Sequence, residues 1–540
     1  MNKQTARLLE QHFDTAFATP DGIKKLRELI LTLAMQGKLV PQDPNDQPAS
    51  ELLKEIADEK ARLIKAGKLK PQKPLPQIKP KEMPCAIPYN WQWVRLIDIA
   101  QYNGRPNAKP EDLSSETWVL DLEDIEKETS VILRRATYAE RLSKSSKSLF
   151  CKGDVLYGKL RPYLNKVVVA EEDGVCTTEI VPIVSFSGIF PVFLKYLLQR
   201  PAFLSYVNSL SYGVKMPRLG SDDAIASIHP LPPVAEQKRI VARIEQLMTR
   251  CDELENLRAE RDKKRLETHA AAINALLSAG ASENFNAAWR FITQHFDELY
   301  SVKENVAELR KVILQLAVMG KLVPQDPNDQ PASELLKEIA AEKACLIKVG
   351  KLKPQKPLPP ITEIEFNRNK PYGWVVRRFG DIFSLEYGDN LPSEKRTSSG
   401  EYPVYGSNGV VGTHFEPSVI EPCIVVGRKG SAGALNLSKT EGCWVTDVAY
   451  FCIPPKVVDL EFAFKLFHTL DFESLGKGIK PGLNRNEAYL IPFFLPPINE
   501  QKRIVARIDQ LMTLCDNLEQ NIAAATDSRT ALLNAMMSKV

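Results

Sequence analysis

Apolar residues at heptad spacing mark two long helices. In each, the apolar side chains are separated by four, three, four and three residues, the spacing of a coiled-coil seam. The seams are Ile240, Ile244, Leu247, Cys251 and Leu254, and Ile504, Ile508, Leu511, Cys515 and Leu518. The first helix can run without a proline from about Glu236 to Leu277, which at ~1.5 Å per residue is roughly 60 Å. Because both seams need apolar partners, we expect the chain to cover them internally, with the two helices as an antiparallel pair.

Shorter amphipathic helices are candidates to cover these seams. Residues 1–37 are predicted to be helical, and segment 23–36 has apolar residues at i, i+3, i+7 and i+10. Segment 306–319 repeats this spacing, and Gly37 and Gly320 follow where a helix often ends in glycine. The alternative is that the long helices are arms that dimerise with a second chain.

Two sequence blocks occur twice. Ala34–Pro76 and Ala317–Pro359 are identical at 38 of 43 positions, and Leu231–Glu255 and Leu495–Glu519 at 20 of 25. The first pair is offset by 283 residues and the second by 264, so the segments between the blocks differ in length. These segments also differ almost entirely in sequence. The chain therefore consists of two matched scaffolds that carry two unmatched inserts.

The first repeated block predicts a helix followed by an extended strap. Ser50 is a candidate N-cap for a helix from Glu51 to about Lys65, which ends before Gly67. The following KLKPQKPLPQIKP is too rich in proline for a helix and is expected to be extended and semi-rigid. Its lysines could lie along DNA phosphates, or the strap could be a solvated linker. The lysines are Lys68, Lys70, Lys73 and Lys79.

Both inserts predict a mixed α/β domain. Each has an apolar strand, a turn with glycine and basic residues, and a second strand, within 153–185 in the first and 423–454 in the second. A short amphipathic helix follows in each, at 193–199 and 462–470. Trp91 and Trp374 occupy matching positions at the start of the two inserts. We therefore expect one fold with two different surfaces.

Composition limits the class of protein. A chain of 540 residues should contain three or four folding units. Its net charge of +4, from 71 basic and 67 acidic residues, means that any DNA-binding face must be local. The nine cysteines are scattered without a zinc-binding spacing, and no apolar run is long enough to span a membrane. We expect a soluble cytoplasmic protein with reduced thiols and no bound metal.

The repeated motifs resemble a known family. LPPVAEQKRIVARIEQL and LPPINEQKRIVARIDQL, with GKLVPQDPNDQPASELLKEI beside each, are similar to the specificity subunit of type I restriction–modification systems. The resemblance implies an α+β protein with two α/β target recognition domains, separated by long antiparallel coiled-coil helices in an internal pseudo-two-fold repeat. The expected segments are scaffold helices and strap at 1–87, a recognition domain at 88–230, a central scaffold at 231–370, a second recognition domain at 371–494 and a spacer helix at 495–540.

The resemblance also implies a function and partners. Each recognition domain would recognise one half of a bipartite, asymmetric site in double-stranded DNA. The long helices would set the gap and dock two methyltransferase subunits, which translocase/nuclease subunits would join. S-adenosylmethionine, ATP and magnesium are expected only in those partner subunits, with no cofactor in this chain.

Candidate DNA contacts gather in basic and polar loops. Arginine can bind guanine through two hydrogen bonds, whereas lysine and a tyrosine hydroxyl suit phosphates. The alternative for these loops is ordinary surface charge at exposed hairpin ends. The candidates are Asn103, Arg105, Lys159, Arg161, Tyr163, Lys166, Lys215 and Arg218 in the first domain, and Ser407, Asn408, Arg428, Lys429, Lys480, Asn484 and Arg485 in the second.

The sequence offers no catalytic apparatus. It contains no GxxxxGK[ST] phosphate loop, no GxGxxG after a strand, and no Asn/Asp-Pro-Pro-aromatic motif of adenine methyltransferases. No catalytic residues are therefore assigned, and a DNA-recognition subunit is expected. The alternative is a coiled-coil scaffold protein whose inserts bind other proteins.

Overall fold

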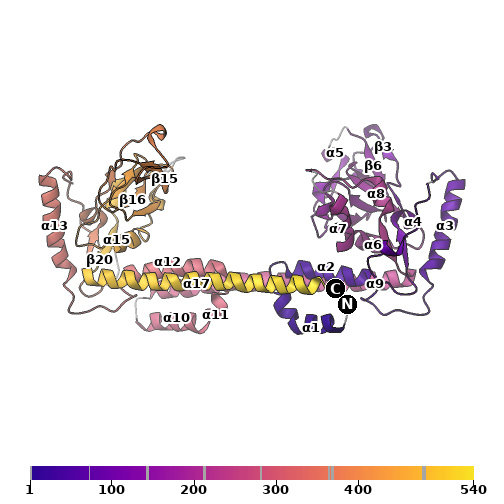
Figure 1. Cartoon of the computed structure of the whole chain (residues 1–540), viewed down its shortest axis with the longest axis horizontal. Helices are drawn as coiled ribbons and strands as arrows, with labels where there is room; N and C mark the ends of the chain where they lie inside the picture. The colour runs from indigo at the N-terminus through magenta and orange to yellow at the C-terminus, as the bar shows by residue number, and fades with distance from the viewer. Residues whose placement is uncertain are drawn as a thin grey trace. The chain divides into compact units, whose positions relative to one another are not determined.

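The structure is a computed structural model that divides into two compact units. It describes the chain except for residues 1–2, 72, 142–144, 211–214, 280–281, 363–364, 366–369, 477–481 and 540. Unit 1 comprises Met1–Ala259 and Thr526–Val540, and unit 2 comprises Glu260–Ala525. Each unit combines scaffold helices with one mixed α/β domain (Figure 1).

Unit 1 begins with three scaffold helices and continues into its domain. Its helices are α1 (Lys3–Phe17), α2 (Gly22–Met35), α3 (Ala49–Lys65), α4 (Leu96–Ile99), α5 (Tyr138–Arg141), α6 (Pro191–Gln199), α7 (Pro201–Leu210), α8 (Ser221–Ala226) and the start of α9 (Val234–Ser278). Its strands are β1 (Gln92–Arg95), β2 (Ala100–Tyr102), β3 (Asn107–Ala108), β4 (Trp118–Leu120), β5 (Ala136–Thr137), β6 (Lys147–Phe150), β7 (Val155–Gly158), β8 (Val167–Val169), β9 (Gly174–Cys176), β10 (Ile180–Ser185) and β11 (Ile228–Leu231).

Unit 2 repeats this order. Its helices are α10 (Ser282–Gln294), α11 (Phe296–Leu299), α12 (Lys303–Val318), α13 (Ala332–Lys348), α14 (Phe379–Ile382), α15 (Leu460–Phe467), α16 (Arg485–Tyr489) and the start of α17 (Ile498–Met537). Its strands are β12 (Val375–Arg378), β13 (Glu386–Tyr387), β14 (Tyr402–Tyr405), β15 (Val410–His414), β16 (Cys423–Gly427), β17 (Leu435–Ser438), β18 (Trp444–Val445), β19 (Ala449–Cys452) and β20 (Pro492–Leu495).

The two domains share two sheets. The strand order β2-β10-β7-β8 in the first domain corresponds to β13-β19-β16-β17 in the second, and every pair in both sheets is antiparallel. The pair β1-β11 corresponds to β12-β20, which joins the start of each domain to its end. The prediction of one α/β fold in both inserts is therefore confirmed.

A third sheet distinguishes the domains. In the first domain it has the order β3-β6-β9-β4-β5, and in the second β15-β14-β18. In the first domain, β4 pairs in parallel with β9 and antiparallel with β5. In the second, β14 likewise pairs in parallel with β18 and antiparallel with β15. The first domain adds β6 and β3 beyond this shared part. The inserts thus differ in length because one sheet is extended.

Each domain shares a hydrophobic core with its scaffold. In unit 1, one core joins buried residues of α2, the sheet strands, α6 and α9. In unit 2, the equivalent core joins α12, the strands, α15 and α17, and α15 lies between the sheet and the helices α12 and α17 (Figure 1). Because apolar burial is the main stabilising term in folding, each domain is expected to be held firmly on its helices.

The long helices are covered mainly as the seams predict. Ile240, Ile244 and Cys251 are buried in the unit 1 core, and Leu247 packs against it. In the second seam, Ile504, Ile508 and Cys515 are buried, and Leu511 and Leu518 pack against the unit 2 core. The exception is Leu254, which is 40% exposed. Its assignment to the seam was wrong, because the unit 1 core does not extend to this position.

Each unit also contains the last part of the long helix that starts in the other unit. The last part of α17 belongs to unit 1, where Leu533 and Met536 form a small core with Phe17 and Leu29. The last part of α9 belongs to unit 2, where Leu276 joins the core of α10 and α12. The candidate partner segments 23–36 and 306–319 therefore do pack against the long helices, as α2 and α12.

Two local predictions about the scaffold need correction. The helical segment 1–37 is divided into α1 and α2 around Pro20, because a residue before proline disfavours helical angles. The helix predicted from Glu51 begins at Ala49 instead, so Ser50 is not its N-cap. The Ala49 amide donates to the carbonyl of Asn90 (2.9 Å), a bond to the domain that replaces a side-chain cap.

Candidate nucleic-acid interface

The two repeated blocks meet in a buried cluster that fixes each domain to its long helix. In unit 1, the carboxylate of Glu236 accepts hydrogen bonds from the Trp91 indole (2.9 Å) and from the Gln42 amide. In unit 2, Glu500 accepts from Trp374 (2.8 Å) and Gln325 (3.1 Å). We call these two groups of three residues the domain clamps. Both glutamates are at most 1% exposed.

Neighbouring residues of the same motif complete each clamp. The side-chain oxygen of Gln237 accepts from the Phe190 amide, and that of Gln501 from the Asp459 amide, both at 2.9 Å. Burial raises the pKa of the Glu236 and Glu500 carboxyls, and the hydrogen bonds from tryptophan and glutamine oppose this shift. The glutamate and glutamine of each EQK motif therefore join domain to helix rather than facing a ligand.

Glycines end the scaffold helices next to the clamps. Gly37 and Gly320 have φ values of +69° and +67°, a region that favours glycine. A Cβ atom at Gly37 would lie 2.4 Å from the Pro88 side chain, and one at Gly320 would lie 2.5 Å from that of Pro371. The predicted glycine ends are thus required both by backbone angle and by the close approach of the domain.

In the first domain, two basic segments that are distant in sequence lie side by side. Leu160 forms a β-bridge with Arg218, the Arg161 amide donates to the Pro217 carbonyl (2.8 Å), and the Leu219 amide donates to the Lys159 carbonyl (3.0 Å). Segments 159–163 and 215–219 therefore form one surface, which we call the first basic loop cluster.

The cations of this cluster fall into two groups. Arg218 is paired with Glu179 through two hydrogen bonds (3.1 and 3.0 Å), and Lys166 donates to the Leu122 carbonyl (2.7 Å), where burial lowers its pKa.

Arg161 and Lys215 are exposed and, within the described part of the chain, make no side-chain hydrogen bond or ion pair. Tyr163 is 45% exposed beside them, and Lys159 is half-buried.

The second domain has the same arrangement at the equivalent place. Lys429 forms a β-bridge with Gly482, and the Leu483 amide donates to the Arg428 carbonyl (2.9 Å). The hairpin between β14 and β15 closes over this turn, since a Cβ at Gly427 would lie 2.4 Å from the Ser407 carbonyl oxygen. Segments 407–408, 428–429 and 482–485 form the second basic loop cluster. Asn408, Lys429 and Asn484 are its exposed candidates.

Several candidates in the second cluster have structural partners. Arg428 donates to the Asp447 carbonyl (2.9 Å) and Arg485 to the Leu385 carbonyl (2.9 Å). Both guanidinium groups lie 4.7 Å from the centre of the Tyr387 ring, a distance suited to cation–π contact. Asn484 caps α16 by accepting from the Asn486 amide (3.0 Å). Lys480 lies outside the described residues.

Tyr387 belongs to this surface although sequence reasoning did not select it. It is 47% exposed and lies between the two arginines. It is the last residue of β13 and lies opposite Tyr450 in the register, a placement that the local sequence does not signal. An exposed aromatic ring between two cations can contact a sugar or a base edge.

Arg105 lies away from the first basic loop cluster. Arg105 is bound to Asp154 through two hydrogen bonds (2.7 and 2.8 Å), and Asp154 is 3% exposed. Asp154 precedes β7, whereas Lys159 follows it, so the two sites are at opposite ends of this strand. Asn103, at φ 58°, is exposed. The structure therefore gives Arg105 a structural partner and does not place it with the other candidates.

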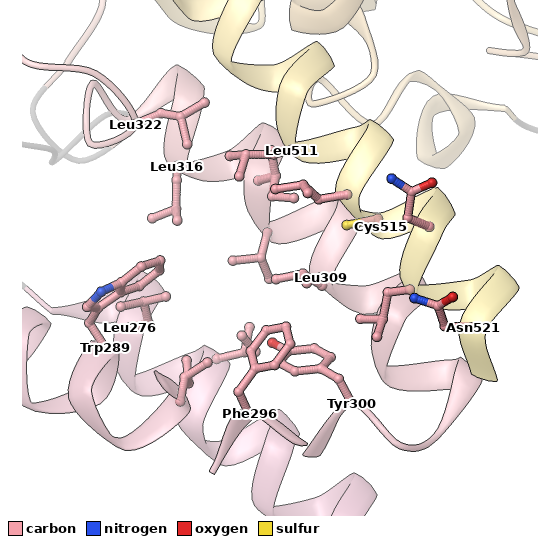
Figure 2. A pocket seen from close by; sticks show the side chains of 17 residues that line it. Leu276, Trp289, Phe296, Tyr300, Leu309, Leu316, Leu322, Leu511, Cys515 and Asn521 are labelled. Carbon is pink, nitrogen blue, oxygen red and sulfur yellow. The ribbon is translucent and has the colours of Figure 1, made fainter. Parts of the chain in front are cut away.

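An apolar cavity lies elsewhere in unit 2. It has a volume of about 490 Å³ and opens between α10, α12 and α17. Figure 2 shows Phe296 and Tyr300 beside each other, with Leu309, Leu511 and Cys515 also lining the cavity. Its lining contains no Asp, Glu, Lys, Arg or His, so it does not resemble a phosphate-binding or acid–base site.

No group of three His, Cys, Asp or Glu residues in the described part of the chain could hold a metal ion. No helix among the described residues is long and apolar enough to cross a membrane.

Comparisons with known proteins agree with the geometry. Residues 371–525 match the family model of the type I restriction modification DNA specificity domain. The chain is 35% identical to the EcoAI specificity subunit of Escherichia coli, over 95% of this chain and 93% of the relative. It is 32% identical to the EcoEI specificity subunit of Escherichia coli, with the same coverage of 95% and 93%. The solved HsdS subunit from Thermoanaerobacter tengcongensis aligns at 19% identity with a TM-score of 0.44, over 84% of this chain and 98% of that chain.

Fold and site define a class of protein in which two related domains present different loop surfaces from one duplicated scaffold. Identity and coverage against the Escherichia coli relatives then establish the family. The chain belongs to the specificity subunits of type I restriction enzymes.

Proposed function

We propose that this chain is the DNA sequence-recognition subunit of a type I restriction–modification complex, without catalytic activity of its own. Each domain recognises one half of a bipartite, asymmetric site in double-stranded DNA. The observation that carries this proposal is the pairing of equivalent domain clamps with different basic loop clusters. Equivalent attachment with different exposed side chains suits two different DNA sequences at a set separation.

The loop clusters supply suitable chemistry. Arg161 in the first cluster is exposed and unpaired within the described residues, so it can form two hydrogen bonds with a guanine. Lys215 and Lys429 are exposed cations suited to phosphates. Cations that are already paired, such as Arg218 with Glu179, shape the loops.

The proposal extends to partners and cofactors. The Escherichia coli relatives are named as specificity subunits of restriction enzymes, so this chain should work within a larger enzyme. Two methyltransferase subunits dock on the long helices, and translocase/nuclease subunits join them. S-adenosylmethionine, ATP and magnesium are bound by those subunits, and the complex acts in the cytoplasm.

Mapping of methylated adenines tests the proposal. The chain is co-expressed with its methyltransferase subunit in a host that lacks other adenine methylation, and the host DNA is analysed by single-molecule sequencing. We expect one bipartite motif, with two short unlike halves around a fixed gap. A control without this chain should give no motif.

Two results would contradict the proposal. If the assembled and active complex left no sequence-defined mark, the domains would not recognise DNA sequence. If the purified chain alone methylated or cut DNA, it would not be a non-catalytic subunit.

A further inference from the structure

Each half of the molecule carries three exposed lysines on its proline-rich strap. We call Lys68, Lys70, Lys73, Lys351, Lys353 and Lys356 the strap lysines. All six are exposed, and none makes an ion pair or a side-chain hydrogen bond with any residue that the structure describes. No aspartate or glutamate occurs within 66–76 or 349–359. Each strap is therefore a local positive charge that the chain itself does not neutralise.

Both straps are anchored at their ends. The chain turns out of α3 at Gly67 (φ +66°) and out of α13 at Gly350 (φ +76°). At the other end, the Pro76 carbonyl accepts from the Arg95 guanidinium (3.0 Å), and the Pro359 carbonyl accepts from Arg378 (2.6 Å). The strap lysines therefore belong to fixed segments rather than to free tails.

Packing does not account for the lysines. Leu69 packs against the unit 1 core and Leu358 against the unit 2 core, so the leucines hold the straps to the protein. The lysines face solvent, yet residues 67–76 and 350–359 have the same sequence, GKLKPQKPLP. The two straps thus present the same charged surface, although the recognition domains between the repeats differ.

The DNA backbone is a ligand that is the same at both half-sites. Phosphates carry no sequence information, whereas base edges differ between the halves. Proline-rich segments extend by about 3.1 Å per residue, so lysines two and three residues apart are separated by roughly 6 and 9 Å along the strap. One DNA strand carries a charge for each ~3.4 Å of helix axis, so phosphates are dense enough for each strap lysine to lie near one.

The chemistry favours phosphate over a protein partner. Lysine is depleted in protein–protein interfaces, which are enriched in aromatic residues, methionine and arginine. Described strap residues between 68 and 76 include no exposed large apolar side chain. Lysine is, in contrast, a common phosphate contact.

We propose that the strap lysines bind the DNA backbone next to each half-site, as two identical contacts that do not depend on sequence. This inference rests on the proposed function, because it assumes that the complex engages DNA. The straps add affinity, and the basic loop clusters supply selectivity.

Charge removal in each strap tests the inference. The variants are K68Q/K70Q/K73Q, K351Q/K353Q/K356Q and their combination, in the full chain co-purified with its methyltransferase subunit. Binding is measured over a series of potassium chloride concentrations, on one duplex with the mapped site and one of equal length without it. Lys54→Gln with Lys337→Gln is the control, since these lysines lie at equivalent positions of α3 and α13 and are already paired with Glu51 and Glu334.

We expect the slope of log affinity against log salt to fall by up to about 2.7 for each strap, or ~0.9 for each phosphate contact. Both duplexes should lose affinity by the same factor, roughly tenfold or more, so selectivity should not change. The first-strap and second-strap variants should be equal in effect, and the control should resemble the unmodified chain. Thermal melting checks that the variants remain folded.

Other outcomes overturn the inference. An unchanged salt slope with loss of methyltransferase subunits, measured by native mass spectrometry, would make the straps a protein-binding surface. An unchanged slope and unchanged assembly would make them solvated linkers. If the unmodified complex did not discriminate between the two duplexes, the proposed function would fail, while the salt slopes would still decide the role of the straps.

Discussion

The exposed residues at the Leu160–Arg218 bridge of the first domain include Arg161 and Tyr163, and those at the Lys429–Gly482 bridge of the second include Asn408 and Lys429. The backbone pairing is the same, but the exposed side chains differ. At the clamps the opposite holds, since Trp91 and Trp374 donate to equivalent glutamates. The comparison teaches that this chain keeps the attachment of its domains constant and varies their exposed loops.

Lengthening the long helices should have the largest effect. Seven residues inserted between Ala259 and Glu260, and seven between Ala525 and Thr526, keep the seams in phase because seven residues are nearly two helical turns. The helices gain about 10 Å, so methylation of the original site should fall more than 100-fold. Methylation mapping should show the same half-sites about three base pairs further apart. An unchanged gap would mean that the helices do not set it.

Removing one clamp should destabilise one unit. Glu500→Ala leaves the Trp374 indole buried without an acceptor and removes one acceptor of the Gln325 amide, which keeps the Gly320 carbonyl, and this should cost unit 2 about 3 kcal/mol. Hydrogen exchange should show faster exchange in unit 2 than in unit 1, and Glu236→Ala should give the reverse. Equal loosening of both units by either variant would contradict the independence of the two clamps.

The clamps also predict a pH dependence. Because burial raises the pKa of Glu236 and Glu500, the folded chain binds their protons more tightly than the unfolded chain. The free energy of unfolding should therefore fall as pH rises from the unfolded pKa through the folded pKa. In urea unfolding at a series of pH values, Glu236→Gln with Glu500→Gln should show a smaller fall than the unmodified chain. A dependence of equal size in both would assign it to other groups.

Arg161 and Lys429 should contribute in different ways. Arg161→Ala should weaken binding to the intact site by about 2 kcal/mol, or roughly 30-fold, and relax selectivity at one base pair of one half-site. Arg161→Lys retains the charge but cannot form the two-pronged contact, so it should not restore selectivity. Lys429→Ala should weaken all sequences alike and lower the salt slope by about 1. Binding assays against single-base variants of the site measure each effect; uniform weakening by Arg161→Ala would instead make Arg161 a phosphate contact.

The smallest expected effect concerns two half-buried lysines. Lys343 donates to the Gly380 and Asp381 carbonyls, and Lys60 to the Ile97 carbonyl. Burial lowers the pKa of Lys343 to about 8 and also lowers that of Lys60. The folded chain then releases the Lys343 proton before the unfolded chain does, so the free energy of unfolding should rise as pH increases above about 8. Lys343→Met should remove this rise and change stability by about 1 kcal/mol or less at neutral pH; a rise that persisted would exclude Lys343 as its source.

The scaffold was largely predictable because its signals are periodic. Heptad spacing located the buried Ile240 and Ile504, and the matching order of strands, basic turn and short helix predicted one fold in both inserts. Heptad spacing wrongly predicted that Leu254 is buried, since burial at the end of a seam depends on whether a partner helix reaches it. The Ser50 cap failed for a related reason: the Ala49 amide is satisfied by a residue of the domain, distant in sequence.

The candidate interface was only partly predictable. Sequence selected the basic turns, but long-range pairing decides which cations are free, and Glu179 and Asp154 occupy Arg218 and Arg105. Such pairs are invisible in a local motif because the partners are tens of residues apart. Tyr387 was missed because a single tyrosine near a strand end carries no distinct pattern. Which of the candidates contact DNA stays a prediction.

Duplication of one domain tests the central claim most directly. Residues 88–230 are replaced by a second copy of 371–494, so that both clamps hold the same domain, and methylated sites are mapped in cells. Because the loop surfaces would be identical, the account predicts a bipartite motif whose two halves are the same sequence as the original second half. A motif that retained the original first half, or that lost the second, would contradict the claim that each domain recognises one half independently.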